Sequence, residues 1–474
     1  MMTARDRAST TGRGAGRWRP AVRRRPVGAQ DSGVPDGPGF SRRQLLQAAL
    51  VGAGGVAIGG ALAGCAPSGA TASGKTSVTV WDLFTGSDGA NMQTMMAAVK
   101  KANPDVAVNS VTLAWGSPYY TKLAMASSGG RPPETAVMHL SRLAGYAPGG
   151  LLEPFDLDEL AKVGIREEDY APAVWKKAQF DGQLYALPLD THPFITFFNP
   201  AIAKKAGLTV TDGHLAGLDS TDGFLAAGKA LAQATGETGV SFGYLNDTAG
   251  CWRMFWGLYC QTGAAYDLTP GKSAQLDDKA AGEVLEFLQE MLDGKVAARN
   301  QDGGAAEGRF MTKRTGMFFS GEWELPTLQG ALPDLGAMPM PTMFGTPATY
   351  ADSHSFVLPK QRHADPARRA ATYRVLAGIV KQGLTWAHAG HIPAYQPIVQ
   401  TPEYQQLSPQ KDYAPAAETA VFDPDVWFTG AGSDFQNRVG GALMDAYSGK
   451  ASPQKTVDRM LHEMNFFLSQ PNPA

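Results

Sequence analysis

The chain has 474 residues, of which 43% are hydrophobic and 18% are charged, and this is the composition of a globular protein rather than a disordered or fibrous one. Ten Arg and three Asp precede Cys65, whereas the rest of the chain carries 32 basic and 41 acidic residues. This acidic body argues against nucleic-acid binding, which needs a basic face. Three Cys are too few for a disulfide scaffold or a four-Cys zinc site.

The first 64 residues predict a disordered stretch followed by an export signal. Arg42-Arg43 stands before a mildly apolar run from Leu45 to Ala63, a pattern typical of bacterial twin-arginine export. The run ends Leu-Ala-Gly-Cys65, which resembles a lipobox, where the Cys is acylated and becomes the new N-terminus. The alternative is a spanning anchor, but the run holds five Gly, each of which costs about 1 kcal/mol relative to Ala in a helix. We expect a lipid on Cys65, a flexible tether over 65–77 and a mature protein outside the cytoplasm, held at the cell membrane.

The first part of the mature body alternates strand and helix patterns. It predicts strands over 77–81, 106–113 and 135–139, a helix with Met92, Met95, Met96 and Val99 on one face that ends before Pro104, a helix from an N-cap at Ser117 to about 127, and a helix from about 140. Such alternation predicts a parallel sheet with right-handed crossovers. Ligands bind at the carboxyl ends of parallel strands, which places a polar loop over 82–89 and His139 on one rim.

The second part predicts fewer and less regular elements. It contains an extended segment over 184–190, a strand over 194–198, helices over 224–234 and 280–292, a strand over 316–319 that turns at 320–321 into a helix opened by Glu322 and Trp323, and a last helix with Val457, Met460, Leu461 and Met464 on one face. Cys251 and Cys260 would lie about 13.5 Å apart on a single helix. A disulfide needs Cα atoms within about 7 Å, so two buried thiols are favoured over a disulfide.

The sequence lacks the common catalytic motifs. It has no Gly-x-Ser-x-Gly elbow and no His-Glu-x-x-His, and its Gly-x₄-Gly-Lys-Thr string at 69–76 falls in the predicted tether. His388 and His391 are three residues apart, but no carboxylate or Cys partner is near them in sequence, so we expect no metal ion and no cofactor. Asp190 and Glu322, each beside aromatic residues, are candidates for the carboxylate pair of a glycoside hydrolase. Alternatively, both carboxylates are simply solvated charges on loops.

Aromatic residues near segment ends are the more informative signal. They are Trp81, Phe84, Trp252, Trp256, Trp323, Tyr350 and Tyr395. An aromatic ring can stack on the apolar face of a sugar, while neighbouring polar side chains bind its hydroxyls. Any single Trp here could equally be a core residue; Trp323, directly after Glu322, is the strongest pocket candidate.

At this point the residues resemble the extracellular solute-binding proteins of ATP-binding-cassette importers, specifically the sugar-binding family 1. The similar segments follow in order along nearly the whole mature body: Thr79 to Gly89, Asn103 to Val106, Gly130 to Glu134, Leu187 to Asn199, Gly316 to Trp323, Ser353 to Ser355 and His391 to Tyr395. Two positions depart from the family pattern. Glu134 replaces Asp, and Phe198 replaces the usual Tyr, which removes one potential hydroxyl.

The resemblance implies a two-lobed α/β fold, each lobe a sheet flanked by helices, with the ligand cleft at the hinge. It implies a first lobe over 78–192 and 345–398, a second lobe over 193–344 and 399–474, and a first crossover near 190–194. Ligand then shifts an open–closed equilibrium. By the same resemblance the ligand-binding residues are Thr85, Asp88, His139, Asp190, Trp252, Trp256, Glu322, Trp323, His354 and Tyr395. The alternative for Asp190 and His192 is that they merely cap the crossover.

The resemblance also implies a function without catalysis. We expect a monomer that captures a carbohydrate, a disaccharide or an oligosaccharide, and delivers it to the permease of an ATP-binding-cassette importer. One alternative is a secreted glycan-processing hydrolase that uses Asp190 and Glu322. Another is a binding protein for a different polar solute, such as a polyol or a glycerophosphodiester, although the similar motifs supply no Arg for a phosphate.

Overall fold

The computed structural model describes residues 74–363 and 365–472. The chain divides into a unit Met1–Ala66 and a unit Pro67–Ala474, and everything below refers to the second unit alone. The predicted export signal and the lipidated Cys65 lie outside the described residues. Among the described helices, none has both the length and the apolar character needed to cross a membrane.

The first lobe is built on a sheet with the strand order β2-β1-β3-β17-β4, in which β7 also pairs with β17. Its strands are β1 (Thr76–Asp82), β2 (Val106–Thr112), β3 (Thr135–His139), β4 (Leu152–Glu153), β7 (Ala186–Pro188) and β17 (His354–Pro359). The first three strands are parallel, as predicted, and β17 joins them antiparallel. Alternating apolar residues such as Val78 and Val80 bury this sheet in a single core.

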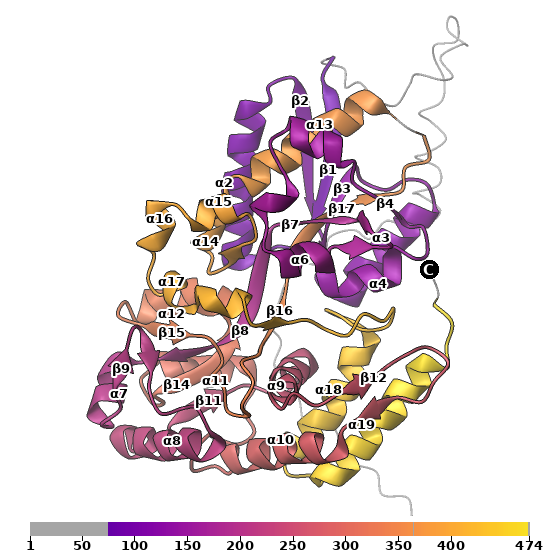
Figure 1. Ribbon diagram of the computed structural model, residues 1–474. Coiled ribbons are helices and arrows are strands. Elements are labelled where there is room, and N and C mark those ends of the chain that lie inside the picture. Colours follow the sequence, from indigo (N-terminus) through magenta and orange to yellow (C-terminus); the bar gives the residue numbers. More distant parts are fainter. Residues whose placement is uncertain (1–73, 364, 473–474) are drawn as a thin grey trace, which may run out of the picture. The chain divides into compact units, whose positions relative to one another are not determined.

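Helices flank this first sheet, with α2 and α13 packed against each other beside β1 (Figure 1). They are α2 (Gly86–Ala102), α3 (Ser117–Ser128), α4 (Leu143–Tyr146), α5 (Leu157–Lys162), α6 (Pro172–Lys177), α13 (Pro366–Val380), α14 (Gly383–Ala387) and α15 (Gln396–Val399). Met92, Met95, Met96 and Val99 are buried on one face of α2, as their spacing predicts.

The second lobe is built on a sheet with the order β11-β14-β8-β16-β19, with β15 and β18 also paired to β8. Its strands are β8 (Asp190–Phe198), β11 (Val240–Phe242), β14 (Met317–Gly321), β15 (Gly336–Met338), β16 (Thr349–Asp352), β18 (Ile392–Pro393) and β19 (Ala420–Val421). Side chains of β8 alternate between its two faces. Phe194 and Phe198 enter one core, while Ile195 and Phe197 enter another.

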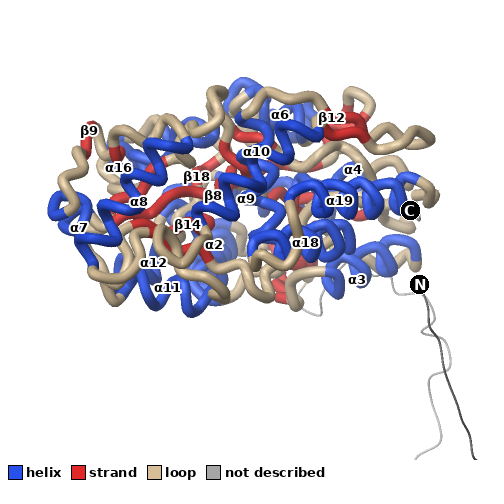
Figure 2. Tube along the Cα trace, turned by 90° about the horizontal axis from the view of Figure 1, so that it is seen from below, coloured by secondary structure: helices blue, strands red, loops and turns tan. Residues whose placement is uncertain are grey.

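The helices of the second lobe include three, α9, α18 and α19, that lie side by side (Figure 2). They are α7 (Pro200–Lys205), α8 (Thr221–Thr235), α9 (Thr248–Gln261), α10 (Asp278–Met291), α11 (Gly303–Met311), α12 (Leu325–Ala331), α17 (Gln410–Tyr413), α18 (Asp434–Tyr447) and α19 (Pro453–Leu468). The short α16 (Pro402–Gln405) lies beside α14 and α15 of the first lobe (Figure 1). Short two-stranded sheets join β5 (Gln179–Phe180) to β6 (Gln183–Leu184), β9 (Val210–Thr211) to β10 (His214–Leu215), and β12 (Tyr266–Asp267) to β13 (Gln275–Leu276).

Two antiparallel chain segments cross between the lobes side by side, and a further connection runs from α15 to α17. The segment β7–β8 leaves the first sheet for the second, and β16–β17 returns beside it, with His192 opposite Asp352 (Figure 1). All nine residues of β8 are buried. We call β8 together with the β16–β17 junction the crossover.

Three local predictions need correction. The polar loop after β1 is shorter than 82–89, because α2 already begins at Gly86 and places Asp88 in its first turn, where a carboxylate favours the helix N-terminus. The N-cap of α3 is Gly116, and Ser117 is already helical. The helix predicted from 140 is a 3₁₀ turn, Leu140–Arg142, followed by the short α4. Cys251 and Cys260 carry free thiols, as favoured, although Cys260 is only partly buried.

Candidate functional site

A cluster of buried polar side chains occupies the crossover, and Asp190 lies at its centre. Its Oδ1 accepts hydrogen bonds from the backbone N–H of His354 at 2.8 Å and pairs with His192 Nδ1 at 3.0 Å. Its Oδ2 accepts from Trp386 Nε1 at 2.7 Å and pairs with His354 Nδ1 at 2.8 Å. Burial alone would raise the pKa of Asp190, but His354 and His192 hold that pKa well below its usual range.

Three imidazoles pack together beside this carboxylate. The rings of His192 and His354 stack with centroids 4.2 Å apart, and the His139 ring meets His354 edge-on at 4.6 Å. Burial, followed by the neighbouring His354, lowers the pKa of His192 to about 3, so His192 is a neutral imidazole at ordinary pH. His139, at the end of β3, places Nδ1 2.7 Å from the hydroxyl of Tyr120 on α3.

His391 joins the cluster to both lobes. Its Nε2 lies 3.1 Å from Asp88 Oδ1 on α2, and its Nδ1 lies 2.8 Å from Glu322 Oε1, at the end of β14. The same Nδ1 is 3.5 Å from Asp190 Oδ2. Burial opposes the charged imidazole, but the pKa of His391 is raised well above its usual range because Asp88, Glu322 and Asp190 surround it. Burial raises the pKa of Glu322 to about 8.

A pocket of about 370 Å³ lies next to this cluster, between elements of the two lobes. Tyr120, Arg142 and Tyr146 line it from the first lobe, and Trp427 and Phe428 line it from the second, with several small polar residues around them. Tyr120 belongs to the pocket and to the cluster, because its hydroxyl contacts His139. Trp427 is the partly exposed aromatic residue of this lining, whereas Tyr120, Tyr146 and Phe428 are buried. An aromatic face beside hydrogen-bonding groups suits a ligand that is apolar on one side and hydroxylated at its edge.

Contacts between the lobes surround this pocket. Ser117 Oγ donates to the carbonyl of Gly432 at 2.7 Å, and the N–H of Ala431 donates to Ser141 Oγ at 3.0 Å. Arg142 donates from Nη1 to the carbonyl of Thr429 at 3.3 Å. These bonds tie the residues before α18 to the start of α3 and to the turn after β3.

The structure brings five of the predicted site residues into the cluster. They are Asp88, His139, Asp190, Glu322 and His354. Trp323 lies at its edge, half-buried, with its ring centroid 6.0 Å from that of His192 and the Arg253 guanidinium 5.1 Å above it. Thr85 is exposed at the N-cap of α2.

Three other predicted residues lie elsewhere. Trp252 and Trp256 are 0% and 1% exposed, stack on each other at 5.0 Å, and donate their ring N–H groups to Asp423 and to the Phe422 carbonyl. This is the placement of core residues, the alternative open to any single Trp, because α9 packs on α18 along this side. Tyr395 packs against Tyr170, with ring centroids 5.9 Å apart.

Part of this arrangement has no signal in the sequence. Arg142 and Trp427 stand 285 positions apart, and no local pattern links them. Trp386 and His391 were not read as partners of Asp190, although the ring of Trp386 stacks on His391 at 4.5 Å. A polar residue directly before or after a buried strand is the signal that could have found Asp352, whose Oδ1 accepts from the Ser141 N–H at 3.1 Å.

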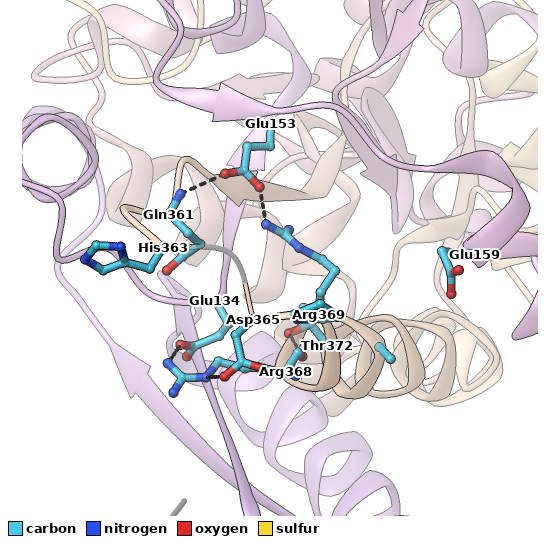
Figure 3. Close-up of a pocket in the computed structure, with 11 residues that line it drawn as sticks. Glu134, Glu153, Glu159, Gln361, His363, Asp365, Arg368, Arg369 and Thr372 are labelled. Atoms are coloured by element: carbon cyan, nitrogen blue, oxygen red, sulfur yellow. Dashed lines mark hydrogen bonds and ion pairs between the residues drawn. The ribbon is translucent and has the colours of Figure 1, made fainter. Parts of the chain in front are cut away.

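A larger pocket, of about 560 Å³, lies at the opposite end of β3 (Figure 3). Its two arginines pair with carboxylates of the same lining (Figure 3). Arg368 Nη1 lies 2.9 Å from Glu134 Oε1, and Arg369 pairs with Glu153. We therefore do not take it as the ligand site, because the charges that would select a ligand are already neutralised.

The hydrolase alternative fits this geometry poorly. A glycosidase needs two carboxyl groups that face the scissile bond from opposite sides. Asp190 and Glu322 instead both lie beside Nδ1 of His391, and both are 0% exposed.

Comparison with known proteins agrees with this architecture. Residues 94–408 match the sequence model of the bacterial extracellular solute-binding protein family. An arabinooligosaccharide-binding protein of Bacillus subtilis is 24% identical over 235 residues, which cover 48% of this chain and 50% of that protein. The chain thus aligns with about half the length of this relative.

Solved structures share the fold. The GacH receptor of Streptomyces glaucescens, solved unliganded and with acarbose, aligns at a TM-score of 0.69 and 18% identity over 83% of this chain and 98% of its own. The cyclic α-maltosyl-1,6-maltose binding protein of Arthrobacter globiformis aligns at a TM-score of 0.66 and 19% identity, over 83% of this chain and 99% of its own. Both are two-lobed sugar-binding proteins. The chain belongs to the bacterial extracellular solute-binding protein family.

Proposed function

We propose that this protein captures an oligosaccharide between its two lobes and delivers it to the permease of an ATP-binding-cassette importer. The observation that carries the proposal is the pocket between the lobes, which Trp427 lines together with Tyr120, Arg142 and Tyr146. Sugars combine an apolar C–H face with a rim of hydroxyls, which these aromatic and polar groups match. The named relatives bind arabinooligosaccharides, acarbose and a cyclic maltose oligomer, which supports the same class of ligand.

In this function the Asp190 cluster would form the rigid floor of the ligand site at the crossover between the two lobes. The proposed ligand contacts on this side are Thr85, Asp88, His139, His354, Glu322 and Trp323, with Asp190 holding the imidazoles in place. The half-buried Trp323 is the member best placed to present a ring. Tyr395 stays a prediction, and we leave Trp252 and Trp256 out of the proposed site because their rings are covered.

Binding is tested by isothermal titration with a panel of maltooligosaccharides and arabinooligosaccharides, with a glycerophosphodiester and a polyol as separate arms. Trp427→Ala is expected to lower the affinity about 10- to 100-fold, because it removes a stacking ring. Trp115→Ala is the matched control, since Trp115 is 46% exposed outside the pocket. Equal affinity in both variants would contradict the proposed site, and release of chromophore from chromogenic glycosides would favour a hydrolase.

We further propose that the mature protein is held at the membrane by a lipid on Cys65 after twin-arginine export. The support is the sequence Leu-Ala-Gly-Cys65 behind the apolar run and Arg42-Arg43. Cys65→Ser is expected to move the protein from the membrane fraction to the medium, whereas Cys260→Ser is expected to leave it with the membranes. A Cys65→Ser variant that still sediments with membranes would rule out this anchor.

A further inference from the structure

We propose that His192, His354, His391 and Asp190 together bind one divalent transition-metal ion, Zn²⁺ by the chemistry of the donors, at the crossover between the lobes. This inference goes beyond carbohydrate binding and does not depend on it. The four side chains come from β8, from β17 and from the residue before β18, so an ion here would join segments that are far apart in the chain.

The donor atoms already lie at distances close to those of a shared ion. One donor atom from each of the four residues lies within 4.8 Å of the others. The nitrogen–oxygen separations to Asp190 are 3.0 Å for His192, 2.8 Å for His354 and 3.5 Å for His391. Two donors bound to one tetrahedral Zn²⁺ at about 2.0–2.2 Å lie about 3.4 Å apart. A separation at the 4.8 Å limit must therefore shrink by about 1.4 Å when the ion enters.

Four buried polar atoms at the cluster lack well-aligned hydrogen bonds in the part of the chain that the structure describes. They are both nitrogens of His391 and both carboxylate oxygens of Glu322, and the contacts that remain to His391 are ion-pair distances of 3.1 Å to Asp88 and 2.8 Å to Glu322. Leaving a buried polar group unpaired costs about 1–3 kcal/mol, and more for a charged group. A divalent ion would accept His391 Nδ1 as a ligand and would offset the charges of Asp190 and Glu322, whose Oε1 lies 2.8 Å from that nitrogen.

The groups that contact the four proposed ligands resemble the outer shell of a metal site. Histidine ligands of metals usually present their second ring nitrogen to a carboxylate or carbonyl, and ligating carboxylates are themselves hydrogen-bonded. Here Asp88 Oδ1 lies 3.1 Å from His391 Nε2, and Trp386 Nε1 donates to Asp190 Oδ2 at 2.7 Å. Three imidazoles and one carboxylate suit Zn²⁺ better than Mg²⁺ or Ca²⁺, which prefer oxygen ligands.

The test uses the full chain, purified without a polyhistidine tag, stripped with a chelator and titrated with Zn²⁺ and with Co²⁺. We expect about one ion per chain and a visible Co²⁺ spectrum of four-coordinate type, which reports the ligand geometry directly. His354→Gln and His192→Asn are expected to weaken metal binding at least about tenfold. His388→Gln is the matched control, because His388 is exposed three residues from His391.

A wild-type protein that takes up neither ion, or that gives only an octahedral Co²⁺ spectrum, would overturn the proposal and leave a purely hydrogen-bonded cluster. This measurement needs no variant to fold. Oligosaccharide affinity is measured in parallel on the stripped and loaded protein. A protein that binds sugar but no ion would contradict the metal site alone. A protein that binds the ion but no sugar would contradict the proposed function alone.

Discussion

Asp423 is a carboxyl group buried outside the crossover cluster, against the aromatic residues of α9. It is 2% exposed and accepts hydrogen bonds from Trp252 Nε1 at 2.5 Å and from the Tyr350 hydroxyl at 2.8 Å. Burial, reinforced by the nearby Asp352, raises its pKa to about 6 from 3.8, and the two hydrogen bonds only partly oppose this rise. An acid whose pKa is raised by folding destabilises the folded state once it must ionise.

Asp423→Asn isolates this effect. Between pH 3.8 and about 6 the unfolded wild type releases a proton that the folded state keeps, so its stability falls as the pH rises. The variant has no carboxyl group here, so its stability does not fall in this way. The difference in free energy of unfolding, variant minus wild type, should therefore rise by up to about 3 kcal/mol between pH 3.5 and pH 6.5. Urea unfolding across this pH range measures the difference. A constant difference at every pH would show that Asp423 has an ordinary pKa.

At the scale of elements, the sequence predicted the parts of the fold that depend on local periodicity. The strands of the first sheet and the buried face of α2 were found because alternating and three-to-four residue patterns dictate them. The start of α2 was missed because Gly86 and Gly89 read as a loop, whereas the Asp88 carboxylate supports a helix N-terminus there.

The crossover cluster was predictable only where its residues flank strands. Asp190, Glu322 and His354 could be selected from the sequence because each begins or follows a buried strand that ends at the crossover. The face of α9 that holds Trp252 and Trp256 could not be assigned, because aromatic residues at this spacing fit a core or a pocket equally well. Trp427 and Arg142 meet only through tertiary packing, which no window of sequence contains.

The packing of α9 against α18 gives a prediction about elements. A Cβ on Gly440 would lie 2.1 Å from the carbonyl oxygen of Thr248, so only glycine lets these helices approach so closely. Gly440→Ala should therefore lower the free energy of unfolding by about 1–3 kcal/mol or more. Gly441→Ala is the control, because nothing lies within 4 Å of its Cβ, and it should raise stability by up to about 1 kcal/mol. Equal urea midpoints for the two variants would contradict this account of the packing.

At the scale of the whole described unit, the lobes are joined by two kinds of contact. The crossover strands hold them permanently, whereas the bonds from Ser117, Ser141 and Arg142 to residues 429–432 form only where the lobes meet. Opening of the pocket must break this second set and leave the first intact. The short segment before α18 is therefore the place to change closure without disturbing either core.

Gly432→Ala is the change that tests this. Gly432 has a φ of +65°, and a Cβ there would lie 2.8 Å from the Cα of Gly116, across the contact between the lobes. The added methyl should hold the lobes apart and weaken oligosaccharide binding about tenfold, because a forced close contact costs about 1–3 kcal/mol. Small-angle scattering should show a larger radius of gyration than in the wild type.

Gly449→Ala separates this effect from backbone strain. Gly449 has a similar φ of +71°, but nothing lies within 4 Å of its Cβ, so the variant carries the strain of a left-handed Ala without any clash between lobes. It should lose about 1–2 kcal/mol of stability while its affinity and radius of gyration stay at the wild-type values. If both variants lost affinity equally, the loss would come from general destabilisation, and the contact between residues 429–432 and the first lobe would have no part in closing the pocket.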